Sequence, residues 1–594
     1  MNAKIGRRFP RRTFLTGASA GIAATALAGR GARAHDGHHG GPTLMRFQGG
    51  AANIPTPREQ TVIVETTETN VYDSFNPYIP NGEAWHFGVN QLCRECMFYA
   101  NFQTGEIIPW LGESWTYNAD FTELTLKLNP NARWSDGQPF TSDDVLFSVE
   151  MLRASEGLTG NATVVENIAS ETAPDPQTVV FALNGTRPRF HYVFIAGIVF
   201  DGLRVVPKHI WEGQDPLTFA NNPPVWTGPY VLDRTIPDQF MFVWRKNPDY
   251  WNKANLDPRP EFAVFRQALP PDAAVQEFTR GNIDVAQIDA IGYLNQQVIV
   301  ESYDKVIAIE FVDPCPRCFF PNFDSPSGLF KTAEGRWAIS YLIDRQAIAD
   351  SVWLPPSRPA LYPWADYASN EKWTNADIQQ QYALTFDPAR AEEMLSAAGA
   401  TKSDDRWQMN GEDLQINIIV PGGTTVQEYQ IAQTLADNAA DIGLDILLTG
   451  LTFPAHSDAL GFGQYDVSSH WVCGLAFDPN ELYDNFESED AVPLETRATR
   501  GNASRMQIPE LDEIVAQLSV VSPDDPANQP LFDQGLEIFM RNLPAIPSIQ
   551  TVFPFTFGTA YWTGWPTQDN LYNIPVNWWA QFLFVIGSLQ PATE

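Results

Sequence analysis

The sequence has few of the residues on which most enzymes and metal proteins depend. Only 8 His, 9 Met and 5 Cys occur among its 594 residues. It contains no phosphate-binding glycine loop, no His-Glu-x-x-His zinc motif and no Gly-x-Ser-x-Gly nucleophile elbow. We therefore predict no catalytic residue and no cofactor. An enzyme hypothesis would need a glycosidase-like pair of carboxylates, and 71 Asp+Glu make any such pair uninformative.

Basic residues are scarce as well. The 38 Lys+Arg give a formal net charge of −33, which repels nucleic acid and anionic membrane surfaces. Long hydrophobic runs are also missing beyond the N-terminal leader. The longest near the C-terminus, 578–589, is too short to span a bilayer and is interrupted by Gln581. A nucleic-acid partner and a membrane-spanning segment are thus not expected.

Aromatic and aliphatic residues are abundant: hydrophobic residues make up 44%, with 37 Phe, 18 Tyr and 18 Trp. This composition predicts a folded chain, too long for one core. Strand-like and helix-like segments alternate without a repeat or a Gly/Ser linker, which indicates an α/β fold. We predict strands at 60–66, 124–128 and 445–449, and helices at 142–152, 387–399 and 426–442.

The first 34 residues have the pattern of an export signal. Arg11, Arg12, Phe14 and Leu15 match the twin-arginine motif, and a weakly apolar run follows. Cleavage is expected after Ala34, a small residue in a small-x-small site. The mature chain would then be periplasmic. Residues 35–59 follow as a flexible leader whose three His are more typical of a polar tail than of a metal site.

A series of motifs resembles solute-binding protein family 5, the extracytoplasmic receptors of peptide, nickel and oligosaccharide ABC importers. The motifs keep the family's order over most of the mature chain, which makes them specific together. They are IPWLGESW at 108–115, ARWSDGQPFTSDDV at 132–145, VPKH at 206–209, TGPY at 227–230, NPDYW at 247–251, GNID at 281–284 and AISYLIDR at 338–345.

The resemblance implies a two-lobed periplasmic-binding-protein fold, with hinged mixed sheets flanked by helices and an extra subdomain inserted in the first lobe. It implies no catalysis, an ABC permease as partner, a small-molecule solute as ligand and a monomeric state. The implied boundaries are lobe I at 60–105, 210–308 and 553–594, the inserted subdomain at 106–209, and lobe II at 309–552.

Two ligand classes remain open. Peptide-binding members of the family hold the peptide's ammonium group with an Asp three residues before an Asp-Pro or Glu-Pro pair, because a buried cation needs an anion. If Asp478-Pro479 is that pair, Leu475 occupies the anchor position, which weakens the peptide hypothesis. Asp478 itself remains an alternative anchor. The segments 75–78, 102–110 and 563–572 look more like the cellobiose-type receptors, so an oligosaccharide is favoured.

Sugar receptors present aromatic platforms to apolar sugar faces and amide or carboxylate groups to the hydroxyls. For any one Trp, core packing is the more usual explanation. The predicted platforms are Trp471, Trp226, Trp85, Trp578 and Trp579, and the predicted hydroxyl partners are Asn76, Asn322 and Asn480.

The cysteines form two C-x-x-C units, Cys93/Cys96 and Cys315/Cys318, with Cys473 left over. Disulfides within or between the units are expected in an oxidising compartment. A tetrahedral zinc site and buried free thiols are the alternatives.

Overall fold

The structure is a computed structural model that describes residues 54–67, 69–80, 82–196, 203–287, 292–354, 356–424, 426–472, 480–498 and 501–592. All of them belong to one unit, Ala51–Glu594. The signal peptide and most of the leader lie outside the described residues, so both stay predictions. Among the described residues, none of the helices combines the length and the apolar character that a bilayer crossing requires.

The first sheet has four strands in the order β1-β11-β10-β9. β1 (Thr61–Thr66) runs parallel to β11 (Phe262–Gln267). β10 (Met241–Lys246) is antiparallel to both β11 and β9 (Tyr230–Ile236). All six residues of β1 are buried, so this strand lies inside the core rather than at a solvated edge.

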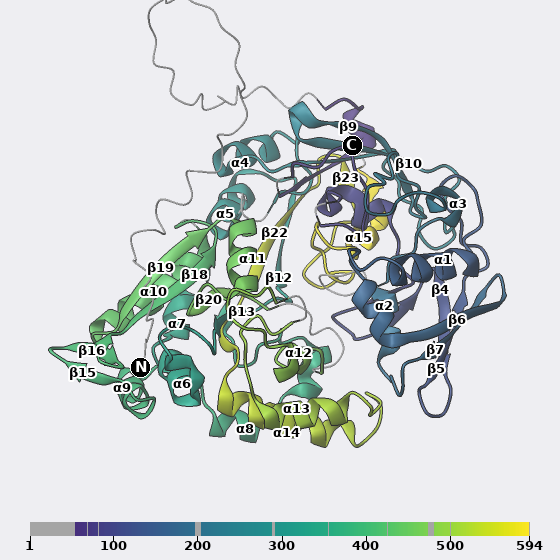
Figure 1. The fold of residues 1–594 in the computed structure, drawn as a ribbon. Coiled ribbons are helices and arrows are strands. Elements are labelled where there is room, and N and C mark those ends of the chain that lie inside the picture. Colours follow the sequence, from purple (N-terminus) through teal and green to yellow (C-terminus); the bar gives the residue numbers. More distant parts are fainter. Residues whose placement is uncertain are drawn as a thin grey trace, which may run out of the picture. The chain divides into compact units, whose positions relative to one another are not determined.

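Two long strands lead from this sheet to a second one. β12 (Val306–Val312) and β22 (Val552–Gly558) pair antiparallel, although they are far apart in the sequence. Val285 bridges β1 and β22 and thereby joins the pair to the first sheet. At the other end the chain continues from β12 into β13 (Arg317–Pro321), and β22 is reached from β21 (Ile546–Gln550). Figure 1 shows β12 and β22 side by side along this passage.

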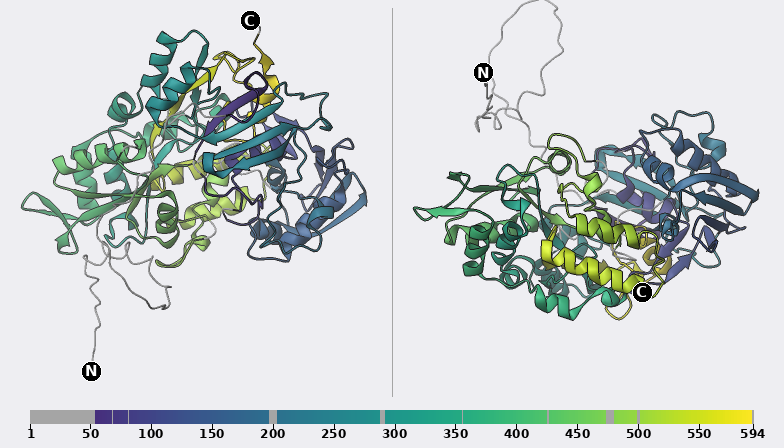
Figure 2. Two further views of the ribbon diagram at one scale, coloured as in Figure 1. Left: turned by 90° about the horizontal axis from the view of Figure 1, so that it is seen from above. Right: turned by 60° about the horizontal axis from the view of Figure 1, so that its bottom comes forward.

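The second sheet has six strands in the order β14-β21-β13-β20-β18-β19. β18 (Gln415–Pro421) is parallel to β19 (Asp445–Leu451) and to β20 (Val467–Trp471), while β13 is antiparallel to β20 and β21. Helices pack on both faces, among them α10 (Gln427–Asp441), which links β18 to β19. On another side, α13 (Pro509–Leu518) and α14 (Asn528–Asn542) form the yellow-green helix pair of Figure 2.

A third sheet lies within 106–209. β4 (Gly112–Tyr117), β5 (Glu123–Leu128), β7 (Thr178–Leu183) and β6 (Ile168–Asp175) are all antiparallel to their neighbours. Helices α1 (Ser142–Arg153) and α2 (Asn161–Asn167) pack beside it. The chain therefore leaves the first sheet after β1, builds a separate sheet and returns at β9.

The strands and helices predicted from the sequence are confirmed. They are β1, β5, α1, α9 (Pro388–Ala397), α10 and β19. The Asp387 side chain accepts a hydrogen bond from the Arg390 amide at 3.0 Å and so caps α9 as predicted. Gly443 ends α10 with a φ of +79°, a conformation that favours glycine.

The remaining regular elements are shorter or flank the sheets. They are β2 (Phe98–Ala100), β3 (Ile107–Pro109), β8 (Ile195–Ala196), β14 (Arg358–Pro359), β15 (Thr401–Ser403), β16 (Arg406–Met409), β17 (Glu412–Asp413), β23 (Trp562–Thr563), β24 (Gln590–Pro591), α3 (Lys208–Trp211), α4 (Pro271–Thr279), α5 (Tyr293–Ser302), α6 (Ala333–Tyr341), α7 (Arg345–Ile348), α8 (Ala376–Gln381), α11 (Phe453–Phe462), α12 (Asn480–Asp484) and α15 (Phe582–Ser588).

Candidate functional site

The two strand connections meet at a short junction. One connection runs from Asp313 to Pro316 between β12 and β13, and the other is Thr551 between β21 and β22. The Asp313 amide donates to the Thr551 carbonyl at 3.0 Å, which ties the connections together. Any motion of one sheet relative to the other would pass through these few residues.

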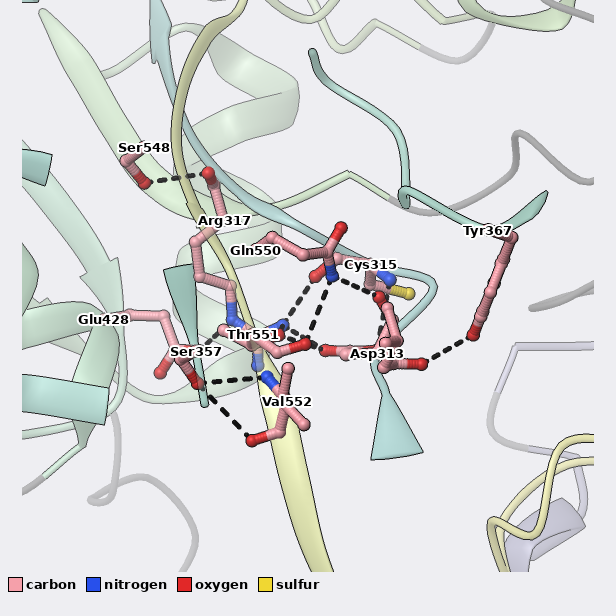
Figure 3. A network of polar contacts seen from close by, with 11 residues as sticks. Asp313, Cys315, Arg317, Ser357, Tyr367, Glu428, Ser548, Gln550, Thr551 and Val552 are labelled. Carbon is pink, nitrogen blue, oxygen red and sulfur yellow. Dashed lines mark hydrogen bonds and ion pairs between the residues drawn. The ribbon is translucent and has the colours of Figure 1, made fainter. Parts of the chain in front are cut away.

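Arg317, the first residue of β13, lies at the centre of this junction (Figure 3). Its guanidinium pairs with the carboxylate of Asp313 and, at 2.8 Å, with that of Glu428 on α10. It also donates to the Cys315 carbonyl at 2.6 Å and to Thr551 Oγ1 at 3.3 Å. Two buried carboxylates thus face one buried cation.

The pKa values follow from this arrangement. Burial raises the pKa of Asp313 above its usual range, while the charge of Arg317 partly offsets the rise. For Arg317, burial disfavours the charge, but Asp313 and Glu428 outweigh it and raise the pKa of the guanidinium. Arg317 therefore stays charged at any physiological pH.

Aromatic rings surround the same guanidinium. The Arg317 Cζ atom lies 4.9 Å from the ring centroid of Trp353, 5.5 Å from that of Phe553 and 5.6 Å from that of Trp471. These separations are typical of cation–π contacts. Phe553 in turn contacts Trp578 edge to face at 6.3 Å. The junction thus combines a fixed charge network with an aromatic wall.

Trp471 extends this wall toward solvent. Its ring stacks on Phe453, the first residue of α11, with centroids 6.3 Å apart and planes 11° apart. Phe453 is 65% exposed and Trp471 is half-buried. A large exposed ring stacked on a second ring offers an apolar platform at the end of β19 and β20.

Phe453 has no motif that marks it in the sequence. Its only signal is positional, because it follows Thr452 where β19 ends and a helix begins. Ligands of open α/β sheets commonly bind outside the carboxyl ends of strands.

Two imidazoles lie near Trp471, His456 buried and His470 half-buried. Ser468 Oγ is 2.9 Å from His456 Nε2 and 2.9 Å from His470 Nδ1, so it bridges the two rings. Burial lowers the pKa of His456 to about 4 and that of His470 well below its ordinary value. Both rings are therefore neutral at pH 7.

The predicted tryptophans have different surroundings. Trp226 is 2% exposed and Trp579 is 5% exposed, whereas Trp85 and Trp578 are half-buried. Trp226 lines a small cavity with room for about one water molecule, and Arg94 lies 5.3 Å from its ring. Trp226 and Trp579 thus pack as core side chains in this structure, and their role as platforms stays a prediction. Trp471 reaches the junction through its contact with Arg317, and Trp578 through its contact with Phe553.

The predicted amides do not join them. Asn76 and Asn322 are fully buried, and each Nδ2 donates to two backbone carbonyls at 2.8–3.1 Å. Both side chains therefore stabilise the fold, and contact of either one with a ligand stays a prediction. Asp478 lies outside the described residues, as does Leu475, and nothing is described for the side chain of Asn480.

The predicted disulfides within or between the two C-x-x-C units are wrong. Cys93, Cys96 and Cys318 are buried and form no disulfide, whereas Cys315 is disulfide-bonded. A Cys315–Cys318 bond is excluded because Cys318 forms no disulfide. The remaining cysteine, Cys473, lies outside the described residues.

Zinc is not supported either. The structure as described contains no group of three or more His, Cys, Asp or Glu side chains placed to hold a metal ion. Burial raises the pKa of the Cys93 and Cys318 thiols far above the ordinary value, so neither is a thiolate at neutral pH.

Comparison with known proteins identifies the fold. The model of the bacterial extracellular solute-binding proteins, family 5, matches residues 106–492. The chain belongs to this family. The twelve-residue helix α1 and the second sheet up to β20 lie within the matched range, and the mixed sheets flanked by helices are those of the family's periplasmic-binding-protein fold.

Solved structures of family 5 proteins have the same fold as this chain over nearly its whole length. A periplasmic oligopeptide-binding protein of an oligopeptide ABC transporter from Thermotoga maritima is 22% identical, with a TM-score of 0.78, and the match covers 90% of this chain and 100% of that one. Its structure with mannohexaose bound gives a TM-score of 0.75 at 91% and 100% coverage. The oligopeptide-binding protein AppA of Bacillus subtilis, in complex with a nonapeptide, is 16% identical, with a TM-score of 0.70 and 90% and 99% coverage.

Curated relatives match over shorter segments. A provisionally named binding protein of Brucella melitensis is 27% identical over 290 residues, which is 46% of this chain and 41% of the relative. A Brucella ovis protein, provisionally named an ABC transporter peptide-binding protein, is 27% identical over 303 residues, or 50% and 53% of the two chains. The matches thus span about half the length of these relatives or less.

Proposed function

We propose that the chain is the extracytoplasmic substrate-binding component of an ABC importer. Membership in family 5 supports this role. In the proposal, lobe I comprises 60–105, 210–308 and 553–594 with 106–209 as its inserted subdomain, and lobe II comprises 309–552. The boundaries at 308/309 and 552/553 fall at the paired strands β12 and β22, which would act as the hinge.

The proposed mechanism is conformational. A solute binds near the junction, the lobes close around it, and a membrane permease recognises the closed form. Affinity comes from the difference in contact between closed and open states, so no covalent step is needed. We expect a monomer that the twin-arginine pathway exports to the periplasm, with cleavage after Ala34.

For the solute we propose an oligosaccharide. The observation that carries this choice is the stacked pair of Trp471 and the exposed Phe453 beside the junction. Sugar rings present apolar C–H faces that pack on such aromatic rings, which bury a large apolar area. The mannohexaose complex of the Thermotoga protein is consistent with this choice, since its fold is the same.

An oligopeptide is the second candidate. The names of the Brucella and Bacillus relatives favour it. Its physical requirement is a carboxylate that meets the peptide's ammonium group in the closed cleft. Asp478 is the sequence candidate for that carboxylate.

Calorimetric titration of the mature chain, residues 35–594, distinguishes the oligosaccharide proposal from the oligopeptide one. One ligand panel holds mannohexaose and cellohexaose, and the other holds pentapeptides with free or acetylated amino termini. We expect a hexasaccharide to bind, with the Kd raised about tenfold or more by Trp471→Ala and by Phe453→Ala. Leu447→Ala is the matched control, because Leu447 is 50% exposed on β19 and is not part of the stacked pair. Binding of free-amine peptides alone would overturn the sugar proposal.

A further inference from the structure

Arg189 links two regions that are remote from the junction. It precedes the 3-10 turn Phe190–Phe194, just after β7 of the inserted sheet. Its guanidinium donates to the carbonyls of Leu518 and Val521, the second at 2.7 Å, and to Asn528 Oδ1 at 2.8 Å. These acceptors are more than 300 residues further along the chain.

The acceptors suit a cation for a physical reason. Leu518 is the last residue of α13, so its carbonyl is among those that have no partner within the helix. The carbonyl end of a helix carries partial negative charge, which favours a cation there. Asn528 begins α14, and its amide oxygen supplies a third acceptor. One planar guanidinium thus meets three acceptors at the turn between the two helices.

One further contact joins the same halves of the molecule. Ser369 Oγ donates to the Phe102 carbonyl at 2.8 Å, which connects residue 369 of the proposed lobe II with residue 102 of the proposed lobe I. The halves therefore contact one another away from the junction as well as at it.

We propose that Arg189 is a latch that stabilises the closed arrangement of the two lobes. The inference rests on the proposed function, because only a hinged receptor has a closed state to hold. Arg189 is a positioning residue: its acceptors are protein groups, so it acts on ligand affinity through the open–closed equilibrium. Removing it favours the open state, since the carbonyls of Leu518 and Val521 and the amide oxygen of Asn528 can then accept hydrogen bonds from water.

Arg187 provides a matched control. It lies two residues away and has the same charge, but its contacts, the Asn184 carbonyl at 3.4 Å and Glu166 at 3.9 Å, remain within 106–209. Arg187→Ala therefore removes an arginine from the same segment without removing the latch. Arg189→Lys keeps the charge but loses the planar guanidinium, whose N–H groups reach the three acceptors.

Spin labels report the distance between the lobes. They are placed at Ser170→Cys and Gln534→Cys, two exposed positions on β6 and α14, and the buried native thiols stay unlabelled. Distances are recorded in the free protein and with saturating mannohexaose. For Arg189→Ala we expect the ratio of the short-distance to the long-distance population to fall about tenfold, equal to about 1.4 kcal/mol. The ratio for Arg189→Lys should lie between that of Arg189→Ala and that of the unsubstituted protein. The ratio for Arg187→Ala should equal that of the unsubstituted protein.

Equal distance distributions for Arg189→Ala and the unsubstituted protein under both conditions would overturn the latch. Failure of the sugar proposal has a different signature. In that case mannohexaose changes no distance, while the difference between Arg189→Ala and Arg187→Ala persists in the free protein. Unchanged melting temperatures of the labelled variants confirm that each one is folded.

Discussion

At the scale of single residues, Arg317 determines how the junction is held. It is the cation between Asp313 and Glu428, and the three side chains are nearly inaccessible to water. Ion pairs of this kind stabilise a fold weakly as units, but removing one partner leaves an uncompensated charge in the interior. Arg317 also packs against Trp353 and Phe553, so its loss would remove apolar contact as well.

Arg317→Ala should lower the free energy of unfolding by about 3–5 kcal/mol, measured by urea denaturation at pH 7. The control is Arg358→Ala, because Arg358 and Asp366 form an ion pair at 2.6 Å in which both side chains are more than 40% exposed. That substitution should cost less than about 1 kcal/mol. Similar losses for the two variants would show that the junction network contributes nothing beyond a surface pair.

His456 makes stability depend on pH. Its pKa is about 4 in the folded protein against an ordinary value of 6.5, so between these values the unfolded chain binds a proton that the folded chain does not. Stability is complete above pH 6.5 and falls as the pH drops toward 4, with a slope of at most about 1.4 kcal/mol per pH unit for one imidazole.

Urea unfolding of the unsubstituted protein and of His456→Asn, at intervals from pH 4 to pH 7.5, tests this slope. The difference in unfolding free energy between the two proteins should shrink as the pH falls, because only the unsubstituted protein loses the His456 contribution. A difference that stays constant with pH would contradict the buried neutral imidazole.

At the scale of elements, the glycine of the TGPY motif shows why the motif is a fold determinant. The Gly228 amide donates to the Cys93 carbonyl at 2.8 Å. A Cβ added at Gly228 would lie 2.3 Å from the Leu92 carbonyl oxygen and 2.5 Å from that of Cys93. The loop before β9 therefore packs directly on the backbone at the end of the helical segment Trp85–Cys93.

Gly228→Ala should lower the free energy of unfolding by about 1–3 kcal/mol, because backbone atoms must move to admit the methyl group. Gly423→Ala is the control, since a Cβ there meets no atom within 4 Å. Its effect should stay within about 0.5 kcal/mol. Thermal and urea unfolding of both variants check the expectation, and equal stability would show that the loop relaxes at no cost.

Local sequence patterns predict local elements well and long-range contacts poorly. Alternation predicts β5, and the Asp387–Pro388 start predicts α9, because the signals lie within the element. The pairing of β12 with β22 depends on residues far apart in the sequence, and no local pattern encodes it. The same limit explains Asn76 and Asn322, whose amide partners are carbonyls more than 100 residues away.

At the scale of the whole molecule, three features combine in the proposed receptor. The paired strands β12 and β22 connect two sheets. The charge network of Arg317 stabilises their junction, and the Trp471–Phe453 pair lies beside it. Chain order and motifs were sufficient to predict the family and its fold. The platform required the structure, because stacking between α11 and β20 is a property of packing rather than of either segment.

The central claim is that an oligosaccharide stacks on Trp471 and Phe453 between the two lobes. The most direct measurement is a crystal structure of residues 35–594 grown with mannohexaose or cellohexaose. We expect sugar rings in contact with both aromatic faces, beside the Arg317 network. A complex in which the sugar leaves Trp471 and Phe453 bare, or crystals that take up only a free-amine pentapeptide, would contradict the account.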